Sequence, residues 1–291
     1  MGIMNISESN NNIIISDAAD FDLVKTFECG QCFRWNKIDD TVYTGVAGSH
    51  ALTISQNGDT ICLHDISRED FFGFWYEYFD LERNYSEIIS SLSADPVLRA
   101  ATAYGQGIRI LKQDLWETII SFIISASNNI PRIKKIVENL CTCFGTEIIY
   151  RGRSYYTFPT PEQLKSVDPD ALSYIRAGFR DKYILDASKQ VSSGQLNLDE
   201  LYSLDNENAK KALMSIYGVG NKVADCVMLF GLQRYDAFPV DVWIKRVMEH
   251  FYFEGKQQIK DVQGFAHEKF GELCGFAQQY LFYYARENKI E

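Results

Sequence analysis

The period of the hydrophobic pattern changes once along this chain, near residue 67, and this change limits the fold more than any other feature. From about 12 to 66, short runs rich in Ile, Val, Thr and Tyr alternate apolar and polar residues, as half-buried strands do. Turn signals at 38–40 and 57–59 separate these runs. From about 68 onward the spacing becomes helical and stays so. The sequence therefore predicts an α+β protein in which an antiparallel sheet precedes a mostly helical body.

Capping residues mark several helix starts in the second part. Side chains that accept from backbone amides precede helical runs at Ser67, Asn129, Thr160 and Asp205 or Asn206. We predict a β-rich domain over residues 1–110 and a helical body over 111–291. The body is expected to form two lobes with a cleft between them, and the C-terminal helix is expected to pack back at that cleft.

Composition and charge leave the class of partner open. The chain has 291 residues, 46% hydrophobic and 23% charged, with a net charge of −10. That acidity argues against a nucleic acid partner, because phosphates attract Lys and Arg. The excess lies in residues 1–100, which hold 16 acidic and 6 basic residues, whereas residues 101–291 hold 23 of each. The neutral part of the chain can still present a basic face.

Nothing in the sequence predicts a secreted or membrane protein. No run approaches the roughly 20 apolar residues that cross a bilayer, and the first residues lack a secretory pattern. Seven scattered cysteines do not form a disulfide framework. We expect a cytoplasmic monomer, or a nuclear one in a eukaryote. Cys29 and Cys32 form a C-x-x-C pair that indicates either ordinary thiols or a metal or redox site.

A Gly-x-Gly turn joins two of the expected helices. Gly218 and Gly220 stand where the backbone must turn tightly or take a positive φ. The first amides of the following helix lack intrahelical partners and carry the positive end of the helix dipole. Such a helix start binds a phosphate without basic side chains, so residues 207–232 are predicted to form a DNA-binding helix–hairpin–helix. Alone, the motif is weak and is more often a plain tight turn.

Lys222 lies in the first turn of the second helix. The dipole disfavours a cation there by about 0.3–1 kcal/mol. Together with burial in a cleft, this favours the neutral amine, a nucleophile that can form a Schiff base with a sugar C1′. The alternative interpretation is a solvated surface lysine.

Asp241 follows Phe238-Pro239-Val240 and stands before a helix predicted over 242–251. Asp is a preferred N-cap, and an ordinary cap is the simplest interpretation. A capping carboxylate is also fixed in place and ionised, as required to stabilise a sugar that develops oxocarbenium character. Lys222 and Asp241, each at a helix start after a turn, therefore form a candidate catalytic pair.

Residues 217–226 (Tyr-Gly-Val-Gly-Asn-Lys-Val-Ala-Asp-Cys), with Pro239-Val240-Asp241, resemble the helix–hairpin–helix, Gly/Pro-Asp superfamily of DNA glycosylases. More narrowly, the chain resembles 8-oxoguanine DNA glycosylase/AP lyase from about Asp22 to Phe282. The resemblance implies a TBP-like N-terminal sheet domain. It also implies base flipping and excision of 8-oxoguanine from duplex DNA in base excision repair. There the lysine matching Lys222 attacks C1′ and then supports β-elimination.

The resemblance also implies a base pocket. Residues 30–35 (Gly-Gln-Cys-Phe-Arg-Trp) resemble the family segment whose glycine carbonyl accepts the N7 hydrogen of 8-oxoguanine, a hydrogen that guanine lacks. Gly30 would therefore discriminate the lesion. Gln278 would bind the Watson–Crick edge, while Phe282 and Cys226 would cover the two faces of the base. Phe230 replaces a pocket methionine of the family, so the pocket is expected to differ in shape.

Two further segments resemble DNA-contacting parts of the family. The loop Ser127-Asn128-Asn129 with Arg132 resembles the asparagine-rich loop that reads the widowed cytosine. Phe179 and Arg180 resemble the wedge that enters the base stack. Ser127 stands where the family usually has asparagine, Phe179 where tyrosine is common, and Trp243 where a phosphate-contacting histidine is typical. Opposite-base selectivity is accordingly left open. Without the resemblance, both segments are interpreted as polar loops.

No cofactor is expected to be required. The resemblance implies a monovalent cation, K⁺ or Na⁺, held by backbone carbonyls of Met214, Ile216 and Val219. The four-cysteine iron–sulfur motif of related glycosylases is excluded, since only Cys274 follows Cys226. The expected partner is double-stranded DNA with an oxidised purine. A same-fold glycosylase for another damaged purine and a non-catalytic helix–hairpin–helix DNA-binding protein remain as alternatives.

Overall fold

The computed structural model describes residues 4–253 and 261–290. The first part forms the predicted antiparallel sheet, with six strands in the order β1-β2-β6-β5-β4-β3. Their bounds are β1 Asn5–Ser9, β2 Asn12–Ser16, β3 Trp35–Asp39, β4 Val42–Ala47, β5 His50–Asn57 and β6 Thr60–His64. The prediction, which placed the first strand at about residue 12, missed β1.

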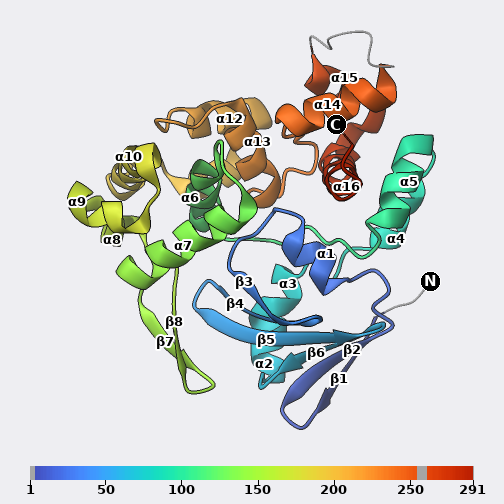
Figure 1. Cartoon of the computed structure of the whole chain (residues 1–291), viewed down its shortest axis with the longest axis horizontal. Helices are drawn as coiled ribbons and strands as arrows, with labels where there is room; N and C mark the ends of the chain where they lie inside the picture. The colour runs from blue at the N-terminus through green and yellow to red at the C-terminus, as the bar shows by residue number, and fades with distance from the viewer. Residues whose placement is uncertain (1–3, 254–260, 291) are drawn as a thin grey trace.

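Alternation along the strands gives the sheet one buried face. In β2, Ile13 and Ile15 are fully buried while their neighbours are partly exposed, as a period of two requires. The helices that cover this face are α1 Leu23–Glu28, α2 Arg68–Asp70, the π-helix η1 Phe71–Trp75 and α3 Tyr76–Tyr78. Figure 1 shows α2 and α3 beside the sheet. Phe27 stacks on Trp35 with ring centroids 4.2 Å apart, so aromatic packing fixes α1 on β3.

The remaining chain is mostly helical, as predicted. Its α-helices are α4 Tyr85–Leu92, α5 Pro96–Tyr104, α6 Leu115–Ser125, α7 Ile130–Phe144, α8 Pro161–Lys165, α9 Pro169–Leu172, α10 Asp181–Ser192, α11 Leu198–Ser203, α12 Asn206–Met214, α13 Asn221–Phe230, α14 Val242–Tyr252, α15 Val262–Phe270 and α16 Cys274–Glu287. Short 3-10 turns are η2 Ser173–Ile175, η3 Gly178–Arg180 and η4 Gly271–Leu273. The predicted caps at Ser67, Asn129, Thr160 and Asp205 each accept a hydrogen bond from the first turn of their helix.

One expectation about this part was wrong. The helical period was predicted to continue without interruption, but β7 Glu147–Tyr150 and β8 Arg153–Tyr156 form a two-stranded hairpin between α7 and α8. The Tyr150 hydroxyl donates to the carbonyl of His64 and accepts from the amide of Thr53. The hairpin is therefore docked on the sheet by tertiary contacts that a local periodicity search does not detect.

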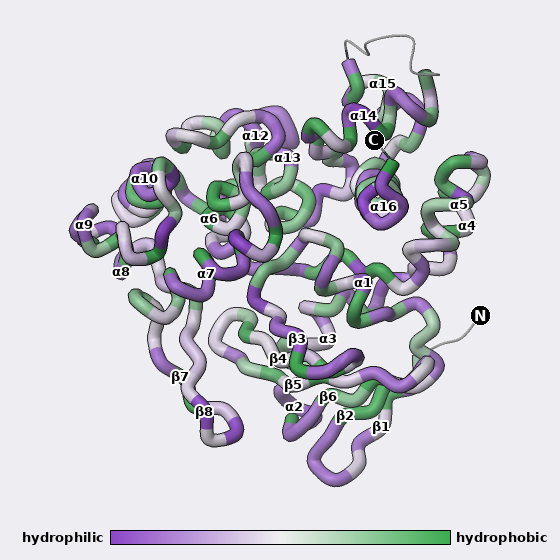
Figure 2. Tube along the Cα trace, in the orientation of Figure 1, coloured by the Kyte–Doolittle hydropathy of each residue, from purple (hydrophilic) through white to green (hydrophobic). Residues whose placement is uncertain are grey.

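Helix α6 is the centre of the helical body. Nine of its residues, Leu115–Trp116 and Thr118–Ile124, are buried, and it packs against α13. Figure 1 places α8–α10 on one side of this pair, and α4, α5 and α14–α16 on the other. In Figure 2 the hydrophobic stretches gather on central elements such as α6, while the tip of the β1–β2 hairpin is hydrophilic. A continuous apolar core thus joins the two lobes.

The two cores do not divide the chain at a single residue. The sheet core contains residues from Ile13 to Phe79 together with Leu111, whereas α4 and α5 contribute to the core of the helical body. Within the described residues, no helix is long and apolar enough to cross a membrane.

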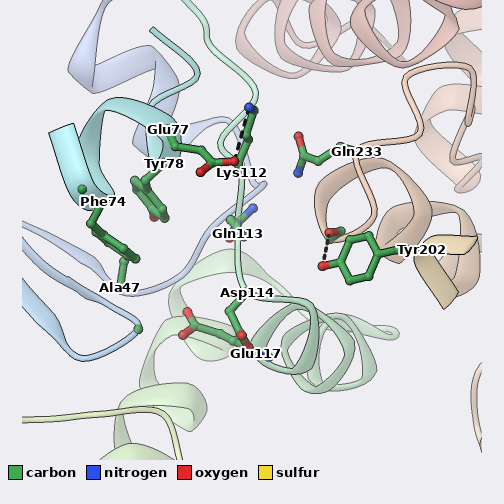
Figure 3. A pocket seen from close by; sticks show the side chains of 13 residues that line it. Ala47, Phe74, Glu77, Tyr78, Lys112, Gln113, Asp114, Glu117, Tyr202 and Gln233 are labelled. Carbon is green, nitrogen blue, oxygen red and sulfur yellow. Dashed lines mark hydrogen bonds and ion pairs between the residues drawn. The ribbon is translucent and has the colours of Figure 1, made fainter. Parts of the chain in front are cut away.

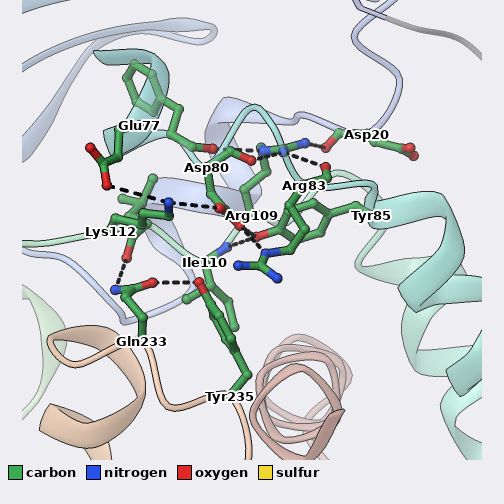
Figure 4. A network of polar contacts seen from close by, with 12 residues as sticks. Asp20, Glu77, Asp80, Arg83, Tyr85, Arg109, Ile110, Lys112, Gln233 and Tyr235 are labelled. Atoms are coloured by element: carbon green, nitrogen blue, oxygen red, sulfur yellow. Dashed lines mark hydrogen bonds and ion pairs between the residues drawn. The ribbon is translucent and has the colours of Figure 1, made fainter. Parts of the chain in front are cut away.

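A buried polar network holds the connection between the cores (Figure 4). The guanidinium of Arg109, 1% exposed, donates to backbone carbonyls of Asp20, Phe79, Asp80 and Arg83. The Asp80 carboxylate accepts from the Arg83 guanidinium and the Tyr85 hydroxyl. Because buried polar groups are costly unless paired, this network fixes how the segment before α4 meets the segment before α6.

Candidate active site

The two predicted catalytic residues open on one cleft of about 900 Å³. Lys222 lies at the start of α13 and Asp241 lies directly before α14. The cleft is lined by Ser125, Ala126, Ser127, Asn128, Asn129, Arg132, Gly218, Gly220, Lys222, Val223, Val240, Asp241, Val242, Trp243 and Lys245. Three segments, 125–132, 218–223 and 240–245, therefore meet here, and the structure brings the predicted amine and carboxylate to the same concave surface.

Three side chains surround the Lys222 amine. Its Nζ lies 3.4 Å from the Ser125 hydroxyl oxygen and 5.2 Å from the centre of the Phe122 ring. The third is Cys226, one helical turn further along α13. Burial raises the pKa of the Cys226 thiol to about 11, and the nearby Lys222 opposes this rise. The amine is thus half enclosed by a hydroxyl, an aromatic face and a neutral thiol.

Asp241 has the predicted N-cap geometry. Its Oδ1 accepts from the backbone amide of Ile244 at 2.7 Å. The extended conformation of Val240 and Asp241 leads directly into α14, which begins at Val242. One carboxylate oxygen therefore anchors the side chain at the helix start, which holds the group in a fixed orientation at the wall of the cleft.

Three of the five residues predicted to bind the base are buried, and none of the five lines the cleft itself. Cys226, Phe230 and Gln278 are each less than 9% exposed, while Gly30 and Phe282 are partly exposed. Gly30 adopts a φ of +86°, and a Cβ there would lie 3.6 Å from the Phe282 ring and 3.4 Å from Ile130. The sheet domain, α7 and α16 therefore meet at Gly30.

One polar and one aromatic feature distinguish these residues. Within the part of the chain that the structure describes, the buried Oε1 of Gln278 has no hydrogen-bond partner, so it is able to accept from a ligand. Phe230 stacks on Phe122 with ring centroids 5.4 Å apart. The Phe230 position, which departs from the family pattern, is therefore linked through Phe122 to the surroundings of the amine.

The predicted cytosine-reading loop lies at the cleft rim, but its side chains are already engaged. The Asn129 Oδ1 caps α7 by accepting from the Arg132 amide, and the Asn128 side chain binds the Ile124 carbonyl and the Asn129 amide. Ser127 has a left-handed φ of +50°. Ser127, Asn129 and Arg132 of this loop are exposed and line the cleft. The hydrogen bonds of Asn128 and Asn129 hold part of the loop in its present conformation.

Arg180 is placed differently from the expectation that it enters DNA. Its side chain is 3% exposed, and its guanidinium donates to carbonyls of Ala126, Ser127 and Ala177. Burial and the nearby Arg132 lower its pKa. In this conformation Arg180 supports the rim loop from behind. Its neighbour Phe179 is 56% exposed, as expected for a wedge.

The hairpin and Trp243 complete the rim. Gly218 has a φ of +91°, and a Cβ there would lie 2.5 Å from the Tyr183 ring, so glycine is required. Gly220 has an extended backbone, and a Cβ there would meet nothing within 4 Å. The expectation that glycine is needed for a tight turn or a positive φ therefore holds only for Gly218. No side chain caps the first turn of α13. Trp243 is 44% exposed.

The sequence argument missed Ser125 and Phe122. Both lie on α6, nearly one hundred residues before Lys222, inside a helix that reads as an ordinary buried segment. Only the packing of α6 against α13 brings them to the amine, so no local signal could have identified them.

A second cavity, of about 350 Å³, lies at the opposite ends of the same two helices (Figure 3). Asp114 and Glu117 at the start of α6, Tyr202 of α11 and Gly231 after α13 line it. Glu117 forms a buried ion pair with Arg34 at 3.6 Å, and the Tyr202 hydroxyl donates to the Gly231 carbonyl at 3.5 Å. Burial raises the pKa of Glu117 to about 7, although Arg34 opposes the shift.

The C-x-x-C pair has no reactive geometry. Cys29 and Cys32 are both buried free thiols, and each thiol lies against a backbone carbonyl. Burial raises the pKa of both thiols, that of Cys29 to about 11. Thiols that resist ionisation are poor nucleophiles and poor metal ligands.

Comparison with known proteins agrees with this geometry. Residues 120–272 match the family model described as HhH-GPD superfamily base excision DNA repair protein. The chain therefore belongs to this superfamily. Residues 13–119 match the N-terminal domain of 8-oxoguanine DNA glycosylase, which places the chain with the 8-oxoguanine glycosylases within it.

Individual relatives extend over most of the chain. The N-glycosylase/DNA lyase of Saccharomyces cerevisiae is 31% identical over 83% of this chain and 71% of its own length. The corresponding Arabidopsis thaliana enzyme is 30% identical over 88% and 75%. A solved Clostridium acetobutylicum 8-oxoguanine glycosylase/lyase, in complex with double-stranded DNA, is 43% identical, covers both chains fully and has a TM-score of 0.94. MBOgg1 with a low-affinity DNA ligand is 51% identical over 98% and 99%, also with a TM-score of 0.94.

Proposed function

We propose that this protein is a bifunctional DNA glycosylase/AP lyase that flips 8-oxoguanine out of duplex DNA and excises it in base excision repair. One observation carries the proposal. The amine of Lys222 and the fixed carboxylate of Asp241 open on a single cleft, and the predicted base-pocket residue Cys226 lies one helical turn from Lys222. A DNA-binding module without catalysis would use the hairpin and leave this pairing unexplained.

The chemistry follows from these two groups. The Lys222 nitrogen attacks C1′ while the N-glycosidic bond breaks, and the base leaves with the bonding electrons and takes up a proton. Asp241 stabilises the positive charge that develops on the sugar in this step. Loss of the amine protons and opening of the ring give the Schiff base. Removal of a C2′ proton then expels the 3′ phosphate by β-elimination.

Lesion recognition is assigned to the residues predicted to bind the base. The Gly30 carbonyl would accept the N7 hydrogen of 8-oxoguanine, and the unpaired Gln278 Oε1 would accept from the Watson–Crick edge. Phe282 and Cys226 would cover the two faces of the base. Extrusion costs a few kcal/mol, and the exposed Phe179 at the cleft rim would hold the remaining stack.

A monovalent cation is the one additional group that we include. Carbonyl oxygens are hard donors suited to K⁺ or Na⁺, and Met214, Ile216 and Val219 belong to the tight turn between α12 and α13. The Ile216 carbonyl accepts from the Val219 amide, and its second lone pair can still bind a cation. This donor set fits. A bound cation would stiffen the hairpin. Separately, we propose that the protein acts as a monomer.

Borohydride trapping tests the proposal. The protein is incubated with duplexes that carry 8-oxoguanine opposite each of the four bases, and excision and covalent adducts are measured. The expected result is excision with a trapped adduct in at least one duplex. Excision of another damaged purine in place of 8-oxoguanine would identify a same-fold enzyme of different specificity. DNA binding without any adduct would identify a non-catalytic module.

A further inference from the structure

An exposed aromatic row continues from the wedge to the hairpin. The rings of Phe179 and Tyr183 are 5.9 Å apart, and those of Tyr183 and Tyr217 are 5.0 Å apart, both edge to face. Phe179 and Tyr217 are 56% and 57% exposed. We call Phe179, Lys182, Tyr183 and Tyr217 the α10 platform. Three of these residues come from η3 and α10, and the fourth directly precedes Gly218.

Lys182 lies on top of this row. Its Nζ is 5.4 Å from the centre of the Tyr183 ring and 5.3 Å from that of Tyr217, within the range of a cation–π contact. The side chain is exposed, and within the described residues it forms no ion pair with a carboxylate. The two rings therefore orient a positive charge toward solvent without neutralising it.

The two carboxylates nearest in sequence on α10 do not cancel this charge. Asp186 faces the hairpin, where its Oδ2 accepts from the Tyr217 amide at 2.8 Å and from Gln190 at 2.7 Å. One oxygen of Asp181 is buried, and the residue lies in the first helical turn, where the dipole favours an anion. Lys182 remains the outward charge of the platform.

The platform is continuous with the cleft and rigidly attached to it. Gly218 and Gly220 line the cleft, and the Tyr183 ring packs directly under Gly218. Gln190 also donates to the carbonyl of Ser215. Helix α10 therefore fixes the wedge, Lys182 and the hairpin relative to one another, so a duplex that reaches the hairpin and Phe179 passes over Lys182.

We propose that the α10 platform is a second DNA-binding surface, in which Lys182 binds a backbone phosphate of the duplex beside the lesion. The proposal rests on the proposed function, because that function brings duplex DNA to the cleft. Contacts to phosphates carry no sequence information but release counterions. The contribution of Lys182 should therefore be independent of sequence and dependent on salt.

The test compares Lys182→Gln with the wild type and with Lys165→Gln. Lys165 is exposed at the end of α8 and does not line the cleft. Binding of a duplex with a non-cleavable abasic-site analogue is measured across salt concentrations. Loss of one phosphate contact should reduce the slope of log K against log[salt] by about 0.9 in Lys182→Gln. Lys165→Gln should keep the wild-type slope, and Lys182→Arg should restore it.

The outcomes separate the two proposals. An unchanged slope in Lys182→Gln, or an equal reduction of the slope in Lys165→Gln, overturns the proposal that Lys182 binds a phosphate. Excision of 8-oxoguanine is measured in parallel with the wild type. If the wild type excises no 8-oxoguanine, the proposed function is wrong, while the salt slopes still report whether Lys182 binds a phosphate.

Discussion

Helices α6 and α13 run in opposite directions, so the end of α6 lies beside the start of α13 at the cleft. The polar groups at this end of the helix pair have a different role from those at the other end. At the cleft end, Lys222 and Ser125 are reached from solvent. At the other end, about 15 Å away along α13, Glu117 is paired with Arg34 and the Gly231 carbonyl is bound by Tyr202. The same pair of helices thus presents polar groups to a ligand at one end and uses them for internal packing at the other. Substitutions at the cleft end should change the rate of excision. Substitutions at the other end, around Glu117 and Gly231, which we call the inner end, should change the free energy of unfolding.

Lys222→Gln tests this separation most directly. Removing the nucleophile should lower excision of 8-oxoguanine by roughly 10³-fold or more and abolish borohydride trapping. The melting temperature and the affinity for lesion DNA should stay close to those of the wild type, since the amine makes one long hydrogen bond, 3.4 Å to Ser125, and a 5.2 Å contact with the Phe122 ring. An adduct that persists in this variant shows that another residue is the nucleophile.

Asp241→Asn isolates the charge of the second catalytic residue. Asn is an equally good N-cap, so the hydrogen bond to the Ile244 amide should persist and stability should remain unchanged. Excision should fall by about 10²-fold, as for loss of one electrostatic stabiliser of a transition state. Single-turnover rates combined with thermal melts provide the check. Wild-type excision by Asp241→Asn, with a loss of stability only in Asp241→Ala, would mean that the residue acts only as a cap.

Glu117→Gln tests the inner end through the pH dependence of the free energy of unfolding. The pKa of Glu117 is raised from 4.5 to about 7, chiefly by burial. Between these values the folded protein holds a proton that the unfolded chain has released, so stability falls as pH rises. Relative to the variant, the wild type should lose on the order of 3 kcal/mol of unfolding free energy across that window. If urea titrations give the same pH dependence of unfolding free energy for the wild type and the variant, the raised pKa of Glu117 is contradicted. Excision per folded molecule should not change.

Ser125→Ala should have the smallest effect. The hydroxyl donates to the Phe122 carbonyl at 2.8 Å, so its free lone pairs face the amine. Losing this orienting contact should reduce kcat by about 3- to 10-fold, the value of one hydrogen bond, with KM unchanged. Ser125→Thr keeps a hydroxyl and should restore the rate. If KM rises and kcat is constant, Ser125 contributes to DNA binding only.

Local chemistry explains which features could be predicted from the sequence. The cap at Asp241, the turn at Gly218 and the start of α13 depend on neighbours within a few residues, and each was confirmed. The family resemblance then supplied roles for Gly30 and Gln278 that no local rule provides. The structure adds that Gln278 is buried and that Gly30 packs near Phe282 and Ile130, and the roles of Gly30 and Gln278 stay predictions until they are tested.

Tertiary contacts explain what could not be predicted. Arg180 has the sequence features of an exposed DNA contact. Its guanidinium instead donates hydrogen bonds to carbonyls of a loop more than fifty residues earlier. Ser125 reads as a helix residue and lies beside the candidate nucleophile only because α6 packs on α13. The β7–β8 hairpin depends on Tyr150 reaching the sheet. Each case needs the partner segment before the residue can be interpreted.

The meeting of three segments at Gly30 has a consequence for how the fold is assembled. Gly30 precedes the sheet strand β3, whereas Phe282 belongs to the last helix and Ile130 to the middle of the chain. These three residues come together only when the sheet domain, α7 and α16 have all docked on one another. Loosening any one of these three segments should therefore disturb the junction at Gly30.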